Sequence, residues 1–452
     1  MLRTLAVQNY RSLRRLVVPL TDLNVVTGPN GSGKSSLYRA LRLLADASRN
    51  GAVAALAREG GLPATLWAGP GKIGRAVREG RHPVQGTVRT EPVALRLGFG
   101  SDDFGYAIDL GLPPPAETAF VLDLEIKREC IWTGPVLRPS AVLCDRLGGL
   151  VKIRDDDGGW SKPYPIRSYD SMLSEFADPQ RAPEVLGLRE TIRSWRFYDH
   201  IRTDADAPAR RSKIGTRTFV LDHDGADLAA ALQTIVEVGD ASALDAAIGS
   251  AFPGSRLSIA RADPGVLSVQ LHQHGLLRPL GVGELSDGTL RYLLWVAALL
   301  SPRPASLLVL NEPETSLHSD LLPSAADLIG HAATQAQVIA VTHSPILIHV
   351  LAGSEPGHCG QGFDAACCRR LWWPRGLRAE TAPVHHLVPG PFPEPVRGPP
   401  RGHRELRPRS GGTRTRLRHR HPAAVYHRRV LPVRGRGGTT SLRIARRAVY
   451  LR

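Results

Sequence analysis

A phosphate-binding pattern lies near the start of the sequence. Residues 28–35, the phosphate loop, read GPNGSGKS and fit G-x-x-x-x-G-K-[ST]. The glycines let the backbone curl so that successive N–H groups point at phosphate oxygens, and a following helix N-terminus adds positive potential. Lys34 is suited to neutralise the β- and γ-phosphates, and the Ser35 hydroxyl to bind Mg²⁺. We therefore predict a site for ATP and Mg²⁺ that comprises Gly28, Pro29, Asn30, Gly31, Ser32, Gly33, Lys34, Ser35 and Ser36.

A second polar cluster follows a run of apolar residues. Residues 307–310 read LLVL, and Asn311-Glu312-Pro313-Glu314 come directly after them. We expect the apolar run to form a strand beside the strand that precedes the phosphate loop. Glu312 is then the candidate general base for an attacking water. Asn311 would help to hold Mg²⁺, but its amide brings no negative charge, so we predict weaker metal binding with the base retained.

Two further motifs could place polar groups at the same site. Residues 285–291 read LSDGTLR, with Ser286 as the predicted N-cap of a helix, and Ser286 and Gly288 could bind an anion there. Residues 341–345 read VTHSP, so His343 would project from the carboxyl end of a strand, where α/β sheets bind ligands. Capped helices and single histidines are common structural features, so neither motif is specific by itself.

The flanking elements alternate in a way that predicts a parallel sheet. Residues 2–28 alternate short apolar runs with polar breaks and indicate strands, and a helix is predicted from Lys34. Residues 86–170 favour strands, and 171–250 favour helices. The last part predicts helix 287–300, strand 306–310, helix 318–332, strand 337–342 and helix 345–352. Such alternation is typical of parallel strands joined by right-handed crossovers.

Composition indicates a protein of the reducing cytoplasm without a membrane segment. The chain has 452 residues, of which 42% are apolar, and its five cysteines show no metal-binding spacing. No apolar run approaches the length of a membrane span, and the N-terminus lacks the apolar core of a signal peptide. We therefore predict a cytoplasmic location and no membrane partner.

The net charge of +16 arises entirely from residues 354–452, which hold 21 Arg, no Lys and five acidic residues. This segment also has 12 Pro and 12 Gly, and no strand or helix is recognisable in it. Three interpretations remain open. The segment is a disordered basic tail that contacts nucleic acid, a folded domain of unfamiliar pattern, or an out-of-frame segment. The preference for Arg over Lys elsewhere, 31 to 6, indicates the GC-rich coding that favours the last of these.

The order of the four motifs resembles that in the ABC-type ATPase head, and specifically the SMC/RecF-like branch that includes bacterial ATPases described as AAA-type or RecF-like. The resemblance covers residues 1–48 and 215–350 and includes YRSL and NEPETSLHSDLL. It implies an α/β P-loop NTPase head with a mixed sheet flanked by helices and an inserted β-rich and helical lobe. The implied segments are 1–75 and 215–353 for the head, 76–214 for the inserted lobe and 354–452 for an irregular basic tail.

The resemblance also implies how such a head would act. Two subunits would dimerise around ATP, with the phosphate loop of one facing Ser286 and Gly288 of the partner subunit. Glu312 would be the base, residues 316–318 would cross the interface, and His343 would be a switch near the γ-phosphate. The family analogy suggests work in DNA repair or maintenance, or in defence against foreign DNA, with DNA as a candidate partner.

Other functions remain open. An ATP-gated binding switch with little turnover would result if Asn311 abolishes hydrolysis. A transporter-type ATPase subunit is disfavoured because 254 positions separate Lys34 from Gly288, which is long for that class. An ATPase joined to a nuclease would need a carboxylate cluster downstream, and the five scattered acidic residues of 354–452 do not form one.

Overall fold

The structure is a computed structural model. It describes residues 1–49, 51–69, 94–113, 119–120, 122–155, 157–176, 178–199, 201–262 and 264–352, and the backbone of 447–450. The interpretations of 354–452 therefore concern a segment that lies, except for four residues, outside the described part of the chain. The described residues all belong to one compact unit, Met1–Trp373 with Ile444–Arg452. The boundaries expected at residues 75 and 214 lie within this unit and stay predictions.

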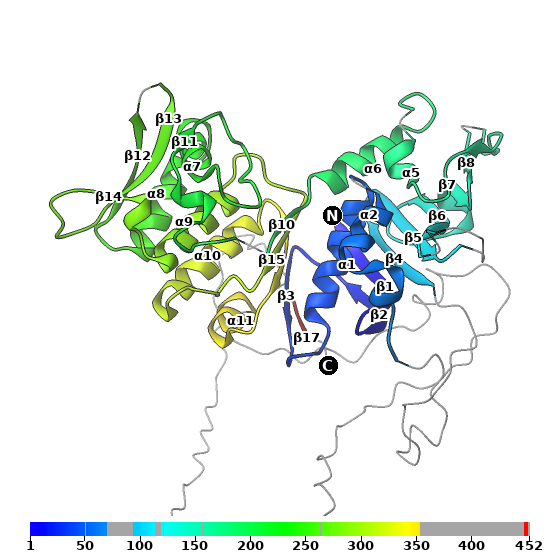
Figure 1. Ribbon diagram of the computed structural model, residues 1–452, viewed down its shortest axis with the longest axis horizontal. Helices are drawn as coiled ribbons and strands as arrows, with labels where there is room; N and C mark the ends of the chain where they lie inside the picture. The colour runs from blue at the N-terminus through cyan, green and yellow to red at the C-terminus, as the bar shows by residue number, and fades with distance from the viewer. Residues whose placement is uncertain are drawn as a thin grey trace, which may run out of the picture. The chain divides into compact units, whose positions relative to one another are not determined.

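A five-stranded sheet runs through this unit (Figure 1). Its strand order is β10-β15-β16-β3-β17, and every neighbouring pair is parallel. The bounds are β3 Leu23–Thr27, β10 Arg196–Tyr198, β15 Leu307–Asn311, β16 Gln337–Val341 and β17 Arg447–Tyr450. The expectation that β15 lies beside β3 is wrong, because the crossover after β15 places β16 between them.

Both faces of this sheet are buried. Leu307 and Val309 of β15 pack into one hydrophobic core, while Leu308 and Leu310 pack into a second core on the opposite face. Strand side chains alternate between faces, so a strand covered on both sides must be apolar throughout. This explains why the LLVL run shows no alternation of polar and apolar residues.

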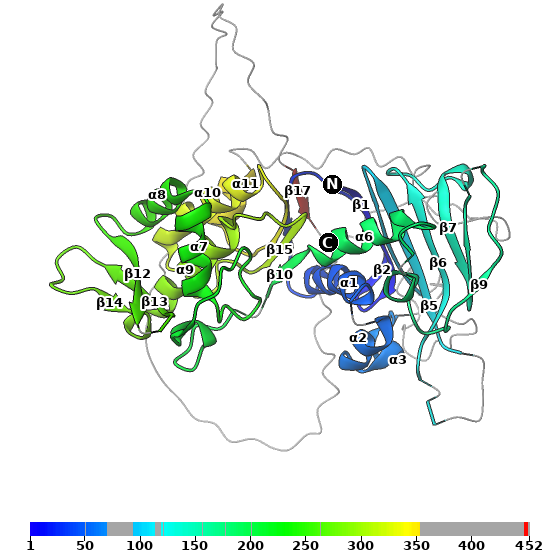
Figure 2. The same cartoon turned by 90° about the horizontal axis from the view of Figure 1, so that it is seen from above.

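An eight-stranded antiparallel sheet contributes to the first core. Its order is β2-β1-β4-β5-β6-β7-β8-β9, so the strands of the expected insert extend the sheet that the N-terminal hairpin begins. Helix α1 contacts β1, β4 and α6 on this side (Figure 2). The bounds are β1 Leu2–Tyr10, β2 Leu13–Pro19, β4 Leu95–Ser101, β5 Phe104–Gly111, β6 Glu125–Thr133, β7 Val142–Leu147, β8 Leu150–Ile153 and β9 Tyr164–Pro165, with α1 Lys34–Ala47, α2 Ala52–Arg58, α3 Gly61–Thr65, η1 Pro139–Ala141, α5 Met172–Glu175 and α6 Pro183–Arg193.

Helices and a small antiparallel sheet form the second core. The bounds are α7 Leu228–Val238, α8 Ala241–Ala251, α9 Asp287–Leu299, α10 Leu322–Ala332, α11 Pro345–Ala352, β11 Lys213–Ile214, β12 Arg256–Ala262, β13 Val266–His272 and β14 Leu280–Gly281, with the 3₁₀ turns η2 Pro208–Arg210, η3 Val282–Glu284 and η4 Ser319–Leu321. Two predictions need correction. Among the described residues between β10 and α7, only η2 is helical, and α10 begins at Leu322 because residues 319–321 form a 3₁₀ turn.

The sheet also has a strand that the sequence did not reveal. The backbone of Arg447–Tyr450 forms β17, which pairs with β3 in parallel register. The sequence analysis recognised no strand beyond residue 352, so this is a correction. A four-residue strand in an arginine-rich setting has no period long enough to detect.

None of the helices in the described part of the chain has the length and apolar character that a membrane span needs.

A buried ion pair joins β6 to β7 and yields a stability prediction. The Arg146 guanidinium lies 3.0 Å from the Glu129 carboxylate, and neither side chain is exposed. Glu129 also accepts hydrogen bonds from Tyr106, Ser171 and the Met172 amide. Arg146→Met would leave a buried carboxylate without its cation, so we expect a loss of about 3–5 kcal/mol in unfolding free energy, measured by urea titration.

The neighbouring pair between Arg128 and Asp145 provides a matched control on the same two strands. Their side chains are 42% and 33% exposed, and their closest charged atoms lie 3.1 Å apart. Because water screens this pair, Arg128→Met should cost less than about 1 kcal/mol. Equal losses for the two variants would contradict the structural role given to the buried pair.

Candidate nucleotide-binding site

The ends of three parallel strands bring the predicted site residues to one edge of the sheet. The phosphate loop follows β3, Glu312 follows β15, and His343 lies just beyond β16. Because all three strands run in the same direction, their carboxyl ends meet at the same edge, where α/β sheets bind ligands. His343 comes from the middle strand of the three, between the phosphate loop and Glu312.

The phosphate loop has the conformation that its glycines permit. Gly31 and Gly33 have φ values of 81° and 103°, in the region that favours glycine. A side chain at position 33 would come within 2.7 Å of Leu13, so the β1–β2 turn closes the back of the loop. The Lys34 ammonium donates to the carbonyls of Gly28 and Pro29 at 2.7 and 2.9 Å. The loop is therefore built around its lysine.

Other residues in the loop and directly after it differ in their exposure to solvent. Pro29, Asn30 and Ser35 are exposed, so the Ser35 hydroxyl is accessible to a ligand. Ser36 is buried, and its hydroxyl lies 2.9 Å from that of Ser12 in the β1–β2 turn. Ser36 therefore supports the loop from behind, which gives a physical role to the YRSL stretch.

The loop fits a phosphate group. The Ser32 hydroxyl is buried and has no hydrogen-bond partner within the described residues, which leaves a donor available for a bound oxygen. Ser35 and the half-buried Asn311 supply neutral oxygen atoms of the kind that hold hydrated Mg²⁺. In the part of the chain that the structure describes, no cluster of three or more His, Cys, Asp or Glu could hold a metal by itself. A metal here would therefore depend on phosphate oxygens for most of its negative ligands.

Glu312 sits in a strained backbone conformation. Its φ is 48°, which is uncommon for a residue other than glycine and costs on the order of 1–2 kcal/mol. Its amide donates to the Val341 carbonyl at 2.8 Å, and its carbonyl accepts from the Thr315 amide at 3.0 Å. The carboxylate is 48% exposed and lies 3.9 Å from Nε2 of His343. The strain thus turns this carboxylate toward solvent beside His343.

Glu314 has a role that the sequence analysis did not assign. One carboxylate oxygen accepts three hydrogen bonds, from the Thr342 hydroxyl at 2.8 Å, the His343 amide at 2.7 Å and the Ser344 amide at 3.1 Å. Through Glu314, the segment after β15 therefore fixes the backbone at His343 and Ser344. In the sequence, the position of Glu314 two residues after Glu312 was the only sign that it belongs to the site. Its hydrogen-bond partners are known only because β15 pairs with β16.

The segment at the start of α9 contacts the segment after β15 within the same chain. Ser286 is exposed and caps α9, where its hydroxyl accepts from the Thr289 amide at 3.2 Å. A side chain at Gly288 would come within 2.9 Å of the Ser316 carbonyl, so glycine permits this close approach. Farther along α9, the Trp295 indole donates to the Pro313 carbonyl at 3.0 Å. The LSDGTLR helix and the Glu312 segment are therefore packed as one assembly.

A charged pair stabilises the turn just before this helix. The Arg278 guanidinium and the Gly281 amide donate to the Glu284 carboxylate. These hydrogen bonds lower the pKa of Glu284 to about 2. Glu284 is therefore ionised at neutral pH. It belongs to η3, which leads directly into Ser286.

Comparison with known families agrees with this arrangement. The family described as "AAA domain, putative AbiEii toxin, Type IV TA system" matches residues 23–349, which is more than half of the chain. The chain belongs to this AAA-domain family. The match spans all three strand ends and the LSDGTLR segment, so the α/β P-loop NTPase head and the assignment to an ATPase superfamily are confirmed.

Solved structures similar to this AAA domain include three SMC heads. An SMC head bound to the C-winged helix domain of ScpA is 14% identical, covers 77% of this chain and 91% of its own, and has a TM-score of 0.42. The SMC head of Thermotoga maritima is 13% identical, with 77% and 91% coverage and a TM-score of 0.38. The Pyrococcus furiosus head with an extended coiled coil, bound to the C-terminal domain of ScpA, is 12% identical, with 77% and 90% coverage and a TM-score of 0.41. No curated protein matches the chain.

The position of Glu314 in this AAA domain predicts a local effect on the His343 segment. Glu314→Ala removes the acceptor of three donors, so we expect a loss of about 1–3 kcal/mol in unfolding free energy and faster amide exchange at His343 and Ser344. Urea titration and hydrogen exchange measure the two effects. Glu312→Gln is the matched control, because its exposed carboxylate should contribute little stability. Indistinguishable stability and exchange in the two variants would refute the role of Glu314.

Proposed function

We propose that this protein is an ATP-binding and ATP-hydrolysing head of the RecF/SMC-like kind, which dimerises around ATP. One observation carries the proposal. The phosphate loop, Glu312 and His343 follow three parallel strands of the same sheet and lie at the same edge. This edge combines a phosphate cradle with an exposed carboxylate and an imidazole, which are groups that can accept a proton from an attacking water or orient it.

Each residue has a role that follows from its place in the site. The N–H groups of residues 30–35 and the Lys34 ammonium would bind the phosphates, with the Ser32 hydroxyl as a further donor. Ser35 and Asn311 would hold Mg²⁺, which neutralises phosphate charge when bound. Glu312 would accept a proton from the attacking water, and the nearby His343 would orient that water or sense the phosphate. Ser286 is exposed and Gly288 is half-buried, and both would meet the nucleotide held by a partner subunit.

An ATP-gated binding switch with little turnover is a second candidate, and Asn311 is the observation that favours it. The residue lies at the end of β15, directly before the proposed base, and brings an amide in place of a charged metal ligand. If Mg²⁺ binds weakly, ATP could close the dimer without efficient hydrolysis. A transporter-type subunit is the third candidate, but no feature of the described residues favours it.

The biological role that we propose is DNA repair or maintenance, or defence against foreign DNA, in the cytoplasm. The family description names a toxin of a type IV toxin–antitoxin system, which supports the defence branch. Two of the similar structures are SMC heads bound to ScpA domains, but their low similarity lends no weight to a partner here. Residues 1–353 carry balanced charge, so DNA contact is not supported by a basic surface.

Two substitutions in the full chain separate binding from hydrolysis. Lys34→Ala should weaken ATP binding by about 100-fold, because it removes a cation from the phosphate cradle. Glu312→Gln should retain ATP affinity within about twofold but lower phosphate release by about 100-fold or more, because only the proton acceptor is lost. A nucleotide titration and a phosphate-release assay measure these effects.

Exposed residues elsewhere provide the controls. Lys213→Ala in β11 and Glu190→Gln in α6 make the same chemical changes on the surface and should match the wild type. Retained ATP affinity in Lys34→Ala would refute the phosphate-loop assignment. Equal near-zero hydrolysis in the wild type and Glu312→Gln, with ATP still bound, would favour the switch over the enzyme.

Asn311→Asp tests the proposed metal position. A carboxylate is a stronger partner than an amide for hydrated Mg²⁺, so the Mg²⁺ concentration that gives half-maximal phosphate release should fall. A magnesium titration at saturating ATP measures it. An unchanged midpoint would show that residue 311 does not lie near the ion.

A further inference from the structure

Residues 199–204 follow β10, and the described residues of this segment contact helix α1 on one side and helix α9 on the other. We call this segment the connector, and the structure describes all of it except residue 200. On one side, Arg42 of α1 donates to both carboxylate oxygens of Asp199 at 2.8 and 2.7 Å. Helix α1 is the one that begins at Lys34. The connector is therefore attached to the helix that carries the phosphate loop.

Helix α9 holds the connector from the other side. This helix begins within residues 285–291, which we call the signature segment. Arg291 is buried and donates from Nη1 to the Ile201 carbonyl. Its guanidinium lies 5.6 Å from the ring centre of Trp295, the residue that bonds the Pro313 carbonyl. The bond to the Ile201 carbonyl places the connector against the side of α9, and the contact with Trp295 lies within that helix.

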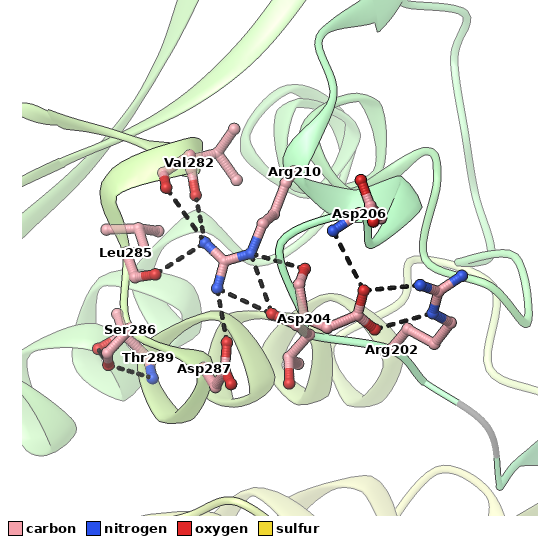
Figure 3. A network of polar contacts seen from close by, with 11 residues as sticks. Arg202, Asp204, Asp206, Arg210, Val282, Leu285, Ser286, Asp287 and Thr289 are labelled. Atoms are coloured by element: carbon pink, nitrogen blue, oxygen red, sulfur yellow. Dashed lines mark hydrogen bonds and ion pairs between the residues drawn. The ribbon is translucent and has the colours of Figure 1, made fainter.

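Arg210 makes the densest set of contacts with the connector. It lies in η2, its side chain is 10% exposed, and its guanidinium points between the connector and residues 282–287 (Figure 3). Toward the connector, Nε donates to the carbonyls of Thr203 and Asp204, both at 3.0 Å, and Nη2 donates to Thr203 at 2.8 Å. These bonds use one edge of the guanidinium.

The other edge of the Arg210 guanidinium holds the residues that lead into α9. Nη1 donates to the Leu285 carbonyl at 2.8 Å and to the Val282 carbonyl at 3.2 Å. Nη2 donates to the Asp287 carboxylate at 2.7 Å. One planar cation therefore holds two backbone carbonyls before Ser286 and the side chain of the residue after it, while Ser286 itself is exposed. An ammonium has three donors at one point and cannot span these acceptors.

We propose that Arg210 is the positioning residue that holds Ser286 and Gly288 in place before ATP binds. Arg210 would act without touching the nucleotide, through the carbonyls of Val282 and Leu285 and the carboxylate of Asp287. The inference deepens the proposed function, since it rests on the signature segment receiving the nucleotide of a second subunit. A segment ordered in advance loses less conformational freedom when the dimer closes. Without Arg210, these residues would have to be ordered at each closure.

Arg202 offers a matched control in the same region. It is 57% exposed and pairs with Asp204 through contacts of 2.8 and 2.6 Å, and Figure 3 shows it on the side away from the signature segment. Arg202→Met thus removes a guanidinium that contacts the connector but not residues 282–287. The comparison with Arg210→Met isolates the contact with the signature segment.

The test uses the full chain and three measurements. For Arg210→Met we expect unchanged affinity for a non-hydrolysable ATP analogue, because the phosphate loop is untouched. We expect kcat for phosphate release to fall at least about tenfold, since small misplacements of a reacting group have large effects on rate. Hydrogen exchange of the amides of residues 285–290 should become faster. Arg210→Lys should be intermediate in rate, and Arg202→Met should match the wild type in all three measurements.

The outcomes separate this inference from the proposed function. If the wild type binds ATP but neither hydrolyses it nor dimerises, the proposed function fails, and the exchange rates of residues 285–290 still decide the role of Arg210. Wild-type exchange and kcat in Arg210→Met would overturn the inference, and so would a loss of analogue affinity as large as the loss of kcat. If Arg210→Met does not fold, Arg210→Lys decides by the same criteria.

Discussion

The site depends on a parallel sheet that is buried on both faces. Alternate residues of β15 pack into two different cores, so neither face of the strand can accept a polar side chain. Chemistry is then possible only where the strands end. Because the strands are parallel, their carboxyl ends and the helices that follow them lie at one edge. The phosphate loop, Glu312 and His343 are together for this reason, although the chain separates the phosphate loop from the other two by about three hundred residues.

Polar contacts then refine what the sheet brings together. Glu314 ties the segment after β15 to the segment after β16, and Trp295 ties it to α9. Arg210 fixes the turn before α9. Each of these side chains binds backbone groups, so each can position a loop without contacting the ligand. Glu312 itself is held at a φ of 48° by its neighbours. The geometry of the site is thus maintained by side chains that bond the backbone of its loops and need not contact the ligand.

Most elements that carry the site were predictable, because their signals are local. The phosphate loop needs glycines and a lysine at fixed spacing, and α1 and α9 have apolar faces with helical period. The predicted strands 306–310 and 337–342 differ from β15 and β16 by one residue at their ends. The expected pairing of β15 with β3 was wrong, since nothing in the sequence shows that β16 inserts between them. β17 was missed because a short edge strand has no measurable period.

The sequence by itself determined the chemistry that is available: a phosphate cradle around Lys34, a candidate base at Glu312, and an amide rather than a carboxylate at Asn311. These are properties of residue type and short-range spacing. Only the tertiary structure decided which other side chains hold these residues in position. Glu314, Trp295 and Arg210 acquire their roles from carbonyls and amides that lie far away in the chain. Backbone acceptors look alike in every sequence, so their partners become known only when the chain is folded.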